Sequence, residues 1–484
     1  MAHELKNKLV YQIITSVSQV LLPLVSYPYI TRILGPENIG KVNYVDFLVQ
    51  MFMIFASFGV PFYGIREIAR VRKDAVQKAI VLKEISVLLC IFSFIAACFF
   101  IAITYPAWKN NTWLYLIGLL NIILSAFSFE WYLQGSEEFR FVAARSLLVR
   151  SVMLAAFFVL VKTQNDYVIY YAIFAAGLLL SVLLNLLKIL SGNNLSSQPL
   201  NYKRHLVPLW HFFLTSSAIS IYIYFDTILL KQLTQSNAAV GYYTVPLKII
   251  KIFQLALLSA GVVLLPRVSY LVAGNNMEGV NFYLSKFFNL LIVIGLPACT
   301  GIFLLAPEIT GVIAGDEFIP AVKVLRILAF LPLIIGLSNL FAFQVLVPFK
   351  KEKQFLIAVL TGCIISIGIN LLFIPVLKEQ GAAFSNLITE IFITIITGIY
   401  SFKILKLRID PKIIFQSILS IIVFIPLIMF VRYLFTSQLA ILCSAIVICI
   451  GCYFTLQLFV FKNSIIREIK HYVAYFLSAK KQTE

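Results

Sequence analysis

The chain is a series of long hydrophobic runs separated by short polar breaks. Apolar stretches of about 18 to 25 residues recur from Leu9 almost to the end, and each is long enough to cross a hydrocarbon core of about 30 Å as a helix. The pattern therefore predicts an all-α polytopic membrane protein. We count fourteen spans, which lie near 9–33, 42–65, 80–104, 112–134, 141–162, 167–190, 206–232, 240–266, 282–306, 321–347, 354–376, 381–404, 412–434 and 438–461.

The composition agrees with this pattern. Hydrophobic residues make up 61% of the chain, charged residues make up 12%, and the mean hydropathy is +0.95, which excludes a water-soluble globular domain. Residues 1–8 are few and polar and a full span follows them, so we expect no cleavable signal peptide. The seven cysteines lie inside apolar runs, and Cys449 and Cys452 have no second pair beside them. We therefore expect no metal site.

The basic residues orient the predicted spans. Most of the 39 Lys and Arg residues fall in polar breaks that lie on one side of the membrane in the predicted topology. We assign only Lys248 and Lys251 to the interior of a span. Positively charged loops face the cytoplasm, so both termini are predicted to be cytoplasmic. Basic loops beside anionic lipid also account for the net charge of +18, and no nucleic-acid partner is needed to explain it.

The longest polar break divides the chain. It predicts an N-terminal six-helix lobe at 1–190, a cytoplasmic linker at 191–205, a C-terminal six-helix lobe at 206–410, a further helix pair at 411–462 and a cytoplasmic tail at 463–484. The two lobes resemble each other at matching turns. "IGKVNY" from Ile39 is matched by "VGYYTV" from Val240, and "FGV" at Phe58 by "AGV" at Ala260. Repeated lobes of this kind are typical of secondary transporters that bind substrate between them.

Two lysines near the middle of the eighth span are the clearest candidates for substrate binding. Lys248 and Lys251 are three residues apart, so a helix places them on one face. A charge inside a membrane costs about 2.5–3.5 kcal/mol on insertion scales and usually marks a functional site. A paired cation suits a phosphate or pyrophosphate. The alternative is that both lysines extend to the interface or pair with acidic residues.

Four further charged residues lie within or at the end of predicted spans. Arg32, Asp46 and Asp226 are expected to line a polar, substrate-binding cavity, and Asp226 and Glu390 are the candidates for ion coupling. Glu390 lies about nine residues into the twelfth span, where a carboxylate could pair with a lysine or take up a proton or sodium ion. We expect no cofactor beyond such a coupling ion.

One stretch looks like a nucleotide site. Gly35, Gly40 and Lys41 reproduce the G-x-x-x-x-G-K core of a phosphate-binding loop. Val42 stands where that motif needs Ser or Thr, Pro36 lies within the loop, and both flanks are predicted spans. We therefore interpret the glycines as a tight turn between two helices on the outer side.

Several segments resemble a known family. They are the Arg-x-Leu-Gly-Pro run at 32–36, "FGVPFYGIREIAR" at 58–70, "FEWYLQGSEEF" at 129–139 and "NLLFIPVLKEQGAAFSNLITE" at 370–390. Together they are similar to the Wzx-type flippases, which belong to the polysaccharide transporter branch of the multidrug/oligosaccharidyl-lipid/polysaccharide (MOP) exporter superfamily.

The resemblance implies fourteen helices in two six-helix lobes that form a V, as in the MATE exporters, plus an outer pair. It implies transport of an undecaprenyl-pyrophosphate-linked oligosaccharide across the bacterial inner membrane for export of O-antigen or another surface polysaccharide, coupled to an ion gradient. Membrane lipid, a polysaccharide polymerase and a chain-length protein are the partners it suggests.

Two other functions stay open. A multidrug exporter of the same superfamily usually has twelve spans and acidic residues rather than paired lysines in its cavity. A membrane polysaccharide polymerase is the enzyme alternative, and it would carry a large outer loop or an acidic catalytic motif. The outer breaks here are short, and the two acids of "AGDEF" at 314–318 lie in a turn. We therefore expect a transporter rather than an enzyme.

Overall fold

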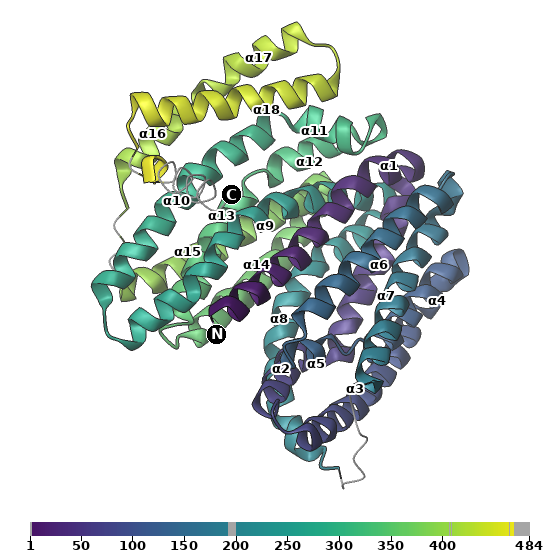
Figure 1. Cartoon of the computed structure of the whole chain (residues 1–484). Coiled ribbons are helices and arrows are strands. Elements are labelled where there is room, and N and C mark those ends of the chain that lie inside the picture. The colour runs from purple at the N-terminus through teal and green to yellow at the C-terminus, as the bar shows by residue number, and fades with distance from the viewer. Residues whose placement is uncertain (1, 192–199, 406, 408, 464, 469–484) are drawn as a thin grey trace, which may run out of the picture. The chain divides into compact units, whose positions relative to one another are not determined.

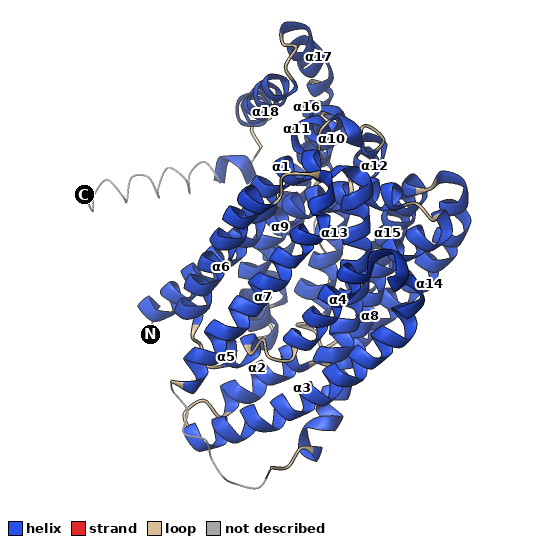
Figure 2. Cartoon of the chain, turned by 90° about the vertical axis from the view of Figure 1, so that its right-hand side faces the viewer, coloured by secondary structure: helices blue, strands red, loops and turns tan. Residues whose placement is uncertain are grey.

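The chain forms two units in the computed structural model, Met1–Gly241 and Tyr242–Glu484. The structure describes residues 2–191, 200–405, 407, 409–463 and 465–468. Throughout these described residues the regular structure is helical and no strand occurs (Figure 2). Parts of the predicted linker and tail, residues 192–199 and 469–484, lie outside the described residues.

The N-terminal unit contains eight α-helices and the start of a ninth (Figure 1). Their bounds are α1 Ala2–Ser57, α2 Val60–Arg70, α3 Ala75–Thr104, α4 Trp108–Ser125, α5 Glu130–Gly135, α6 Phe139–Leu160, α7 Tyr167–Leu190, α8 Lys203–Thr234 and α9 Asn237–Ala273, with 3-10 turns η1 Tyr105–Ala107 and η2 Gln164–Asp166. The boundary between the units falls inside α9, so α8 is grouped with the N-terminal unit.

Among the described residues, the C-terminal unit contains the rest of α9 and the labelled helices α10 to α18. Their bounds are α10 Met277–Leu304, α11 Ala306–Ile313, α12 Ala321–Leu328, α13 Leu331–Asn339, α14 Glu352–Leu377, α15 Glu379–Ile404, α16 Pro411–Ile422, α17 Phe424–Leu434 and α18 Gln438–Thr455, with the 3-10 turn η3 Asp316–Phe318 and π-helices η4 Leu340–Leu346 and η5 Leu456–Val460.

The helices reproduce most of the predicted spans. Among the described residues, 11 segments are long and apolar enough to cross a membrane. The first, Leu22–Arg70, covers the end of the first predicted span and all of the second, and each of the others coincides with one predicted span. Helices α8 and α9 occupy the predicted seventh and eighth positions but are not among the 11. The protein is therefore an all-helical, multi-pass membrane protein, while the number fourteen stays a prediction.

The turn that resembles a phosphate-binding loop joins two halves of α1. Gly35 has a positive φ of 68°, which suits a residue without a Cβ, and it breaks the helix there. A Cβ on Gly40 would lie 1.8 Å from the Asn237 carbonyl oxygen, so the turn meets the start of α9 backbone to backbone. Glu37 accepts hydrogen bonds from the Asn237 side chain at 2.6 Å and from the Ala238 amide at 3.0 Å. The predicted tight turn is confirmed.

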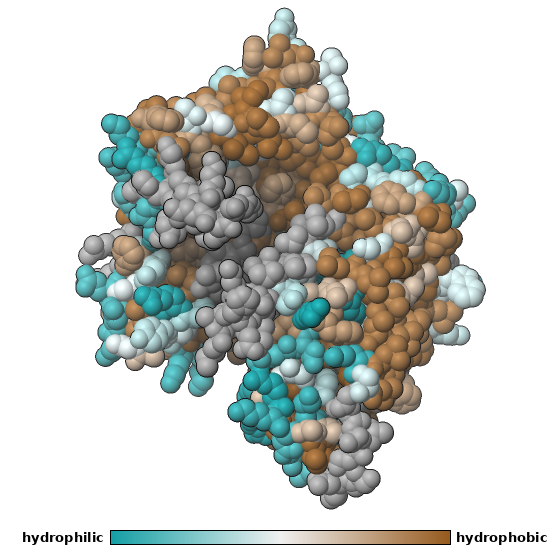
Figure 3. All heavy atoms as spheres, viewed as in Figure 1, coloured by the Kyte–Doolittle hydropathy of each residue, from teal (hydrophilic) through white to brown (hydrophobic). Residues whose placement is uncertain are grey.

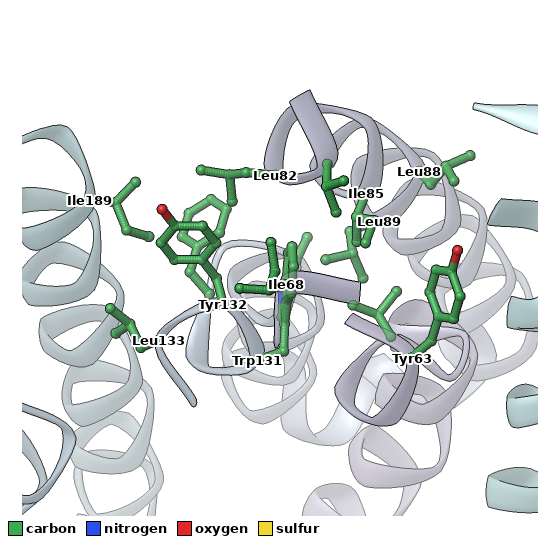
Figure 4. Packing of buried hydrophobic residues seen from close by; sticks show 14 of the residues in the cluster. Tyr63, Ile68, Leu82, Ile85, Leu88, Leu89, Trp131, Tyr132, Leu133 and Ile189 are labelled. Atoms are coloured by element: carbon green, nitrogen blue, oxygen red, sulfur yellow. The ribbon is translucent and has the colours of Figure 1, made fainter. Parts of the chain in front are cut away.

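Two of the segments that carry the family resemblance pack against each other. Phe58 and Gly59 have positive φ values and end α1, and Pro61 lies in the first turn of α2. Helix α2 then contacts α5, where Gly64 leaves room for the Trp131 ring. Figure 4 shows the resulting core, with side chains from α2, α3, α5 and α7; its labelled residues are Tyr63, Ile68, Leu82, Ile85, Leu88, Leu89, Trp131, Tyr132, Leu133 and Ile189.

The outer faces of the helices are hydrophobic. Phe94 on α3 and Val447 on α18 are among many large apolar side chains that remain exposed. Figure 3 shows hydrophobic residues over the flanks of the helices and hydrophilic residues gathered around α2. Arg66 and Arg70 on α2, and Arg72 and Lys73 directly after it, are exposed. This distribution is expected of helices whose flanks face lipid and whose ends reach water.

The last helices are fixed to the C-terminal unit by polar contacts. The Arg432 guanidinium on α17 donates to the buried Glu308 carboxylate on α11, with nitrogen-to-oxygen distances of 2.7 and 2.9 Å. Tyr453 on α18 donates to the Val293 carbonyl of α10 at 2.7 Å. Gln457 donates to Ser420 at 3.1 Å and joins η5 to α16. In lipid, interhelical hydrogen bonds of this kind act together with close packing to hold helices to one another.

Candidate functional site

Three predicted site residues lie in the N-terminal unit. Arg32 is exposed on the first half of α1, and its Nη1 donates to the Pro28 carbonyl oxygen at 2.6 Å. Asp46 is partly exposed on the second half of α1. Asp226 lies on α8, which packs against α1, and only 1% of it is exposed.

The other three lie in the C-terminal unit. Lys248 and Lys251 follow each other on α9 at the predicted helical spacing, with Lys248 half-buried and Lys251 exposed. Glu390 is buried on α15. Close to the lysines in sequence, Phe253 and Leu257 of α9 line an apolar cavity of about 260 Å³ together with residues of α10 between Phe287 and Ala298. A cation pair and an apolar cavity on one helix could serve an anionic lipid.

One expectation about the charges is wrong. Lys248 and Lys251 are not the only cations within a span, because Arg145 and Arg150 lie on α6 between Phe139 and Leu160. Arg145 is buried and donates to the Asn185 side chain of α7 at 2.8 Å. It also pairs with Glu130 of α5 at 3.4 Å. Arg145 therefore holds three helices together.

Arg150 is a residue that the sequence reasoning missed. It is the twelfth residue of α6, half-buried, and its Nη1 donates to the Thr15 carbonyl oxygen of α1 at 2.8 Å and to the Ser18 hydroxyl. An arginine ten residues inside an apolar run is costly in lipid, and that cost was the available signal. Arg150 was counted with the basic residues of the neighbouring polar break, so its position inside a span was overlooked.

The surroundings of Asp46 also include residues that sequence reasoning did not select. The Tyr171 hydroxyl of α7 lies beside the Asp46 carboxylate and the Asn121 side chain of α4. Tyr27 and Tyr224 are close enough to Asp46 to interact with its charge. These residues are uncharged and stand in apolar runs, so only their proximity in the fold reveals the cluster.

A second polar cluster fixes the start of α8 after the linker. The buried Glu84 carboxylate of α3 lies 2.8 Å from His205 Nε2 and 3.0 Å from Arg204 Nε. It also accepts a hydrogen bond from the Asn201 amide at 2.6 Å. On the other side of the imidazole, the Tyr63 hydroxyl of α2 lies 2.6 Å from His205 Nδ1. The cluster therefore joins the end of the linker to α2 and α3.

Metal-ligating residues do not gather in the described part of the chain. Among those residues, no group of three or more His, Cys, Asp or Glu side chains is close enough to hold a metal ion. Cys449 and Cys452 lie on α18 as free thiols.

Comparisons with known proteins point to one class of membrane protein. The chain is 25% identical over 398 residues to a putative O-antigen transporter of Escherichia coli (strain K12), covering 81% of this chain and 95% of the relative. It is 24% identical to a putative O-antigen transporter of Shigella dysenteriae, covering 78% of this chain and 94% of that one.

Solved structures show the same fold. The lipid II flippase MurJ in an inward closed conformation matches with a TM-score of 0.64 and 15% identity, covering 94% of this chain and 100% of MurJ. An inward-facing multidrug resistance MATE family transporter of the MOP superfamily matches with a TM-score of 0.65 and 14% identity, covering 80% of this chain and 94% of the transporter. The fold is that of the MOP superfamily. Residues 5–272 match the family described as polysaccharide biosynthesis protein, and the chain belongs to that family.

Proposed function

We propose that this chain flips an undecaprenyl-pyrophosphate-linked oligosaccharide across the bacterial inner membrane, for export of O-antigen or another surface polysaccharide. Transport would proceed by ion-coupled alternating access through fourteen helices, with both termini in the cytoplasm. The curated relatives are putative O-antigen transporters and the fold is shared with a multidrug transporter, which supports a transporter rather than an enzyme. The observation that carries the proposal is the membership in the polysaccharide biosynthesis family, which covers residues 5–272.

The charges inside the helices support an anionic substrate. Lys248 and Lys251 present two ammonium groups within one helical turn of α9. Pyrophosphate is recognised by paired cations of this kind. Arg32, Asp46 and Asp226 remain candidates for contact with the glycan, and Glu390 and Asp226 for the coupling ion. Each assignment is a proposal.

The apolar cavity between α9 and α10 supports a lipid-linked substrate. Its lining is formed by aromatic and aliphatic side chains, including Phe253, Leu257 and Phe287. A polyprenyl chain is a branched hydrocarbon, and a cavity of this size accommodates a few of its isoprene units without leaving a polar group unsatisfied. The nearby lysines of α9 would then contact the phosphate end of the same molecule.

A multidrug exporter is the alternative within the superfamily. The MATE transporter matches 80% of this chain, whereas MurJ matches 94% of it. The chain ends with two candidate spans, Pro411–Leu434 and Gln438–Val460. Multidrug exporters usually have twelve spans, and this pair is the addition that brings the predicted number to fourteen. We therefore place this alternative second.

Deletion of the gene tests the proposal. We expect undecaprenyl-linked oligosaccharide to accumulate in the cytoplasmic leaflet while the surface polymer disappears, and a plasmid copy should restore export. Leaflet location can be measured by labelling glycan in intact cells and in inverted vesicles. Unchanged surface polymer combined with greater drug sensitivity would favour the multidrug alternative.

The lysine pair gives the sharpest residue-level prediction. We expect Lys248→Ala with Lys251→Ala to abolish glycan export without loss of protein, because the substrate pyrophosphate loses both cations. The matched control is Lys351→Ala with Lys353→Ala, which removes the same charge from exposed positions around the start of α14. Surface polymer is measured per molecule of transporter in membranes. Full export by the α9 double variant would show that the pyrophosphate binds elsewhere.

A further inference from the structure

Helix α2 has one face in the core of the N-terminal unit and the opposite face exposed. Tyr63 and Ile68 pack into the core with residues of α3 and α5. Phe62, Arg66 and Arg70 are exposed and follow one another at four-residue intervals, so they lie along one side of the helix. Figure 3 shows the hydrophilic surface that gathers around α2. The exposed side therefore combines one aromatic ring with two guanidinium groups.

A buried acid holds the two guanidinium groups in place. Only 7% of the Glu67 side chain is exposed, and its Oε1 lies 3.5 Å from Arg66 Nη2 while its Oε2 lies 2.7 Å from Arg70 Nη2. The Arg66 and Arg70 side chains are nevertheless 58% and 69% exposed. One carboxylate offsets only one of the two positive charges, so the pair keeps a net positive charge at the surface.

Aromatic rings fix the position of Arg66 further. Its Cζ lies 5.4 Å from the centre of the Tyr63 ring and 5.3 Å from the centre of the Phe212 ring of α8. Cation–π contacts of this kind hold an arginine side chain in place. An arginine that is already ordered loses less conformational entropy when it binds an anion. The two guanidinium groups are therefore arranged for an anion before a ligand arrives.

We propose that this face of α2 binds the headgroup of an anionic phospholipid such as phosphatidylglycerol, with Arg66 and Arg70 on the phosphate and Phe62 against the acyl chains. A guanidinium fork matches the geometry of phosphate oxygens and binds two of them at once. One candidate span ends with α2 at Arg70, and the next begins at Ala75, so α2 lies at a boundary between membrane and water. Phosphates and hydrocarbon are adjacent there, as the face requires.

The exposure of the site favours an abundant membrane lipid over a scarce substrate. Both arginine side chains are more than half exposed, and solvent weakens a charge contact at such positions. A weak site is filled when its ligand is a major component of the surrounding leaflet, because occupancy depends on concentration as well as affinity. Phe62 is 62% exposed on the same face, which suits a ligand that carries hydrocarbon beside its phosphate. Lipid binding here does not depend on what the protein transports.

Titration of the purified full-length protein in detergent with dioleoyl phosphatidylglycerol tests the proposal. Native mass spectrometry measures the apparent Kd of the first bound lipid. We expect this lipid to bind at least about tenfold more tightly than dioleoyl phosphatidylcholine, which has the same chains and no net charge. Arg66→Gln with Arg70→Gln should weaken phosphatidylglycerol binding about 30-fold, since each basic residue near an anionic surface contributes about fivefold. Phe62→Ala should weaken it about fivefold by removing contact with the acyl chains.

A matched control and a further variant separate lipid binding from general charge and from folding. Lys351→Gln with Lys353→Gln removes the same charge from exposed positions around the start of α14 and should bind phosphatidylglycerol as the wild type does. The double arginine variant leaves Glu67 buried without its two cations, which destabilises α2. Adding Glu67→Gln removes that buried charge. The triple variant should therefore melt close to the wild-type temperature and still bind the lipid about 30-fold less tightly.

The site is overturned if the lysine control loses as much affinity as the arginine variants, because the overall charge of the protein would then attract the lipid. It is also overturned if the folded triple variant binds phosphatidylglycerol as tightly as the wild type. Undecaprenyl pyrophosphate provides the remaining comparison. If the triple substitution weakened binding of undecaprenyl pyrophosphate and left phosphatidylglycerol binding unchanged, this face of α2 would be a docking site for the transported lipid and the phospholipid assignment would be wrong.

Discussion

The segments at 58–70 and 260–273 begin with the same pattern, in which an aromatic or small residue is followed by Gly and Val. The two segments nevertheless fold differently. In the first, the helix ends at Phe58 and Gly59 and a separate amphipathic helix, α2, begins at Val60. In the second, α9 continues through Gly261 to Ala273. The proline accounts for much of the difference. Pro61 follows Gly59 by two residues and suits a helix start, whereas Val263 stands at that place in α9 and the proline comes at 266.

The contacts around each glycine reinforce the two outcomes. The broken segment is held by the core that α2 forms with α3 and α5 and by the Tyr63, His205 and Glu84 cluster. The continuous segment is held by Gln344 of the π-helix η4, whose Nε2 donates to the Gly261 carbonyl oxygen at 2.9 Å. The two segments therefore differ in part because their neighbours differ. Local sequence alone does not fix the helix break.

Loss of the Glu84 carboxylate should have the largest effect on the broken segment. Glu84→Ala leaves buried His205 and partly exposed Arg204 without their shared acid. We expect a loss of about 3 kcal/mol of unfolding free energy, the low end for a broken buried ion pair, because Arg204 keeps some contact with solvent. Thermal unfolding of the purified protein would measure it. Exposed Glu352→Ala on α14 is the control, and equal stability of the two variants would show that the cluster does not hold α2.

Alanine at the two glycines compares the segments directly. Gly59 has a φ of 79°, and a Cβ there would lie 2.7 Å from the Phe213 amide nitrogen, so Gly59→Ala should cost about 1–3 kcal/mol. Gly261 has no positive φ, and its Cβ would meet the flexible end of Gln344 at 3.2 Å. Gly261→Ala should therefore change stability by less than about 1 kcal/mol. Melting temperatures and yields of the two variants would test this, and equal losses would contradict the comparison.

Much of the fold follows from the apolar runs, because a run of this length must become a helix in lipid to satisfy its backbone. The turn at Gly35 was predictable for a related reason, since a glycine and a proline interrupt the run. The break at Gly59 was not, because the glycine lies near the end of a span and only the packing of α2 on α5 shows where the helix stops.

The candidate site was less accessible to sequence reasoning than the fold. Charged residues such as Lys248 and Glu390 attract attention because burying a charge is costly. Asn121 and Tyr171 are neutral and common in helices, and their significance comes from being beside Asp46. Arg150 is also a charged residue, but it was counted with the basic residues of a polar break. Assigning each charge to one side of the membrane does not distinguish a residue near a helix end from one in the middle of the helix.

A small effect is also expected at Gln344, where the continuous segment can be tested without disturbing its glycine. Gln344→Ala removes the hydrogen bond to the Gly261 carbonyl oxygen and opens space in a buried position. That carbonyl can still accept its own helical bond, so we expect a loss of about 1 kcal/mol, typical of one net hydrogen bond, and α9 to remain a single helix. Cysteine accessibility at Val268, which is fully buried on α9, and thermal unfolding would measure the two effects. A newly reactive cysteine there would mean that α9 breaks as α1 does at Gly59, and that Gln344 rather than the position of the proline keeps the second segment straight.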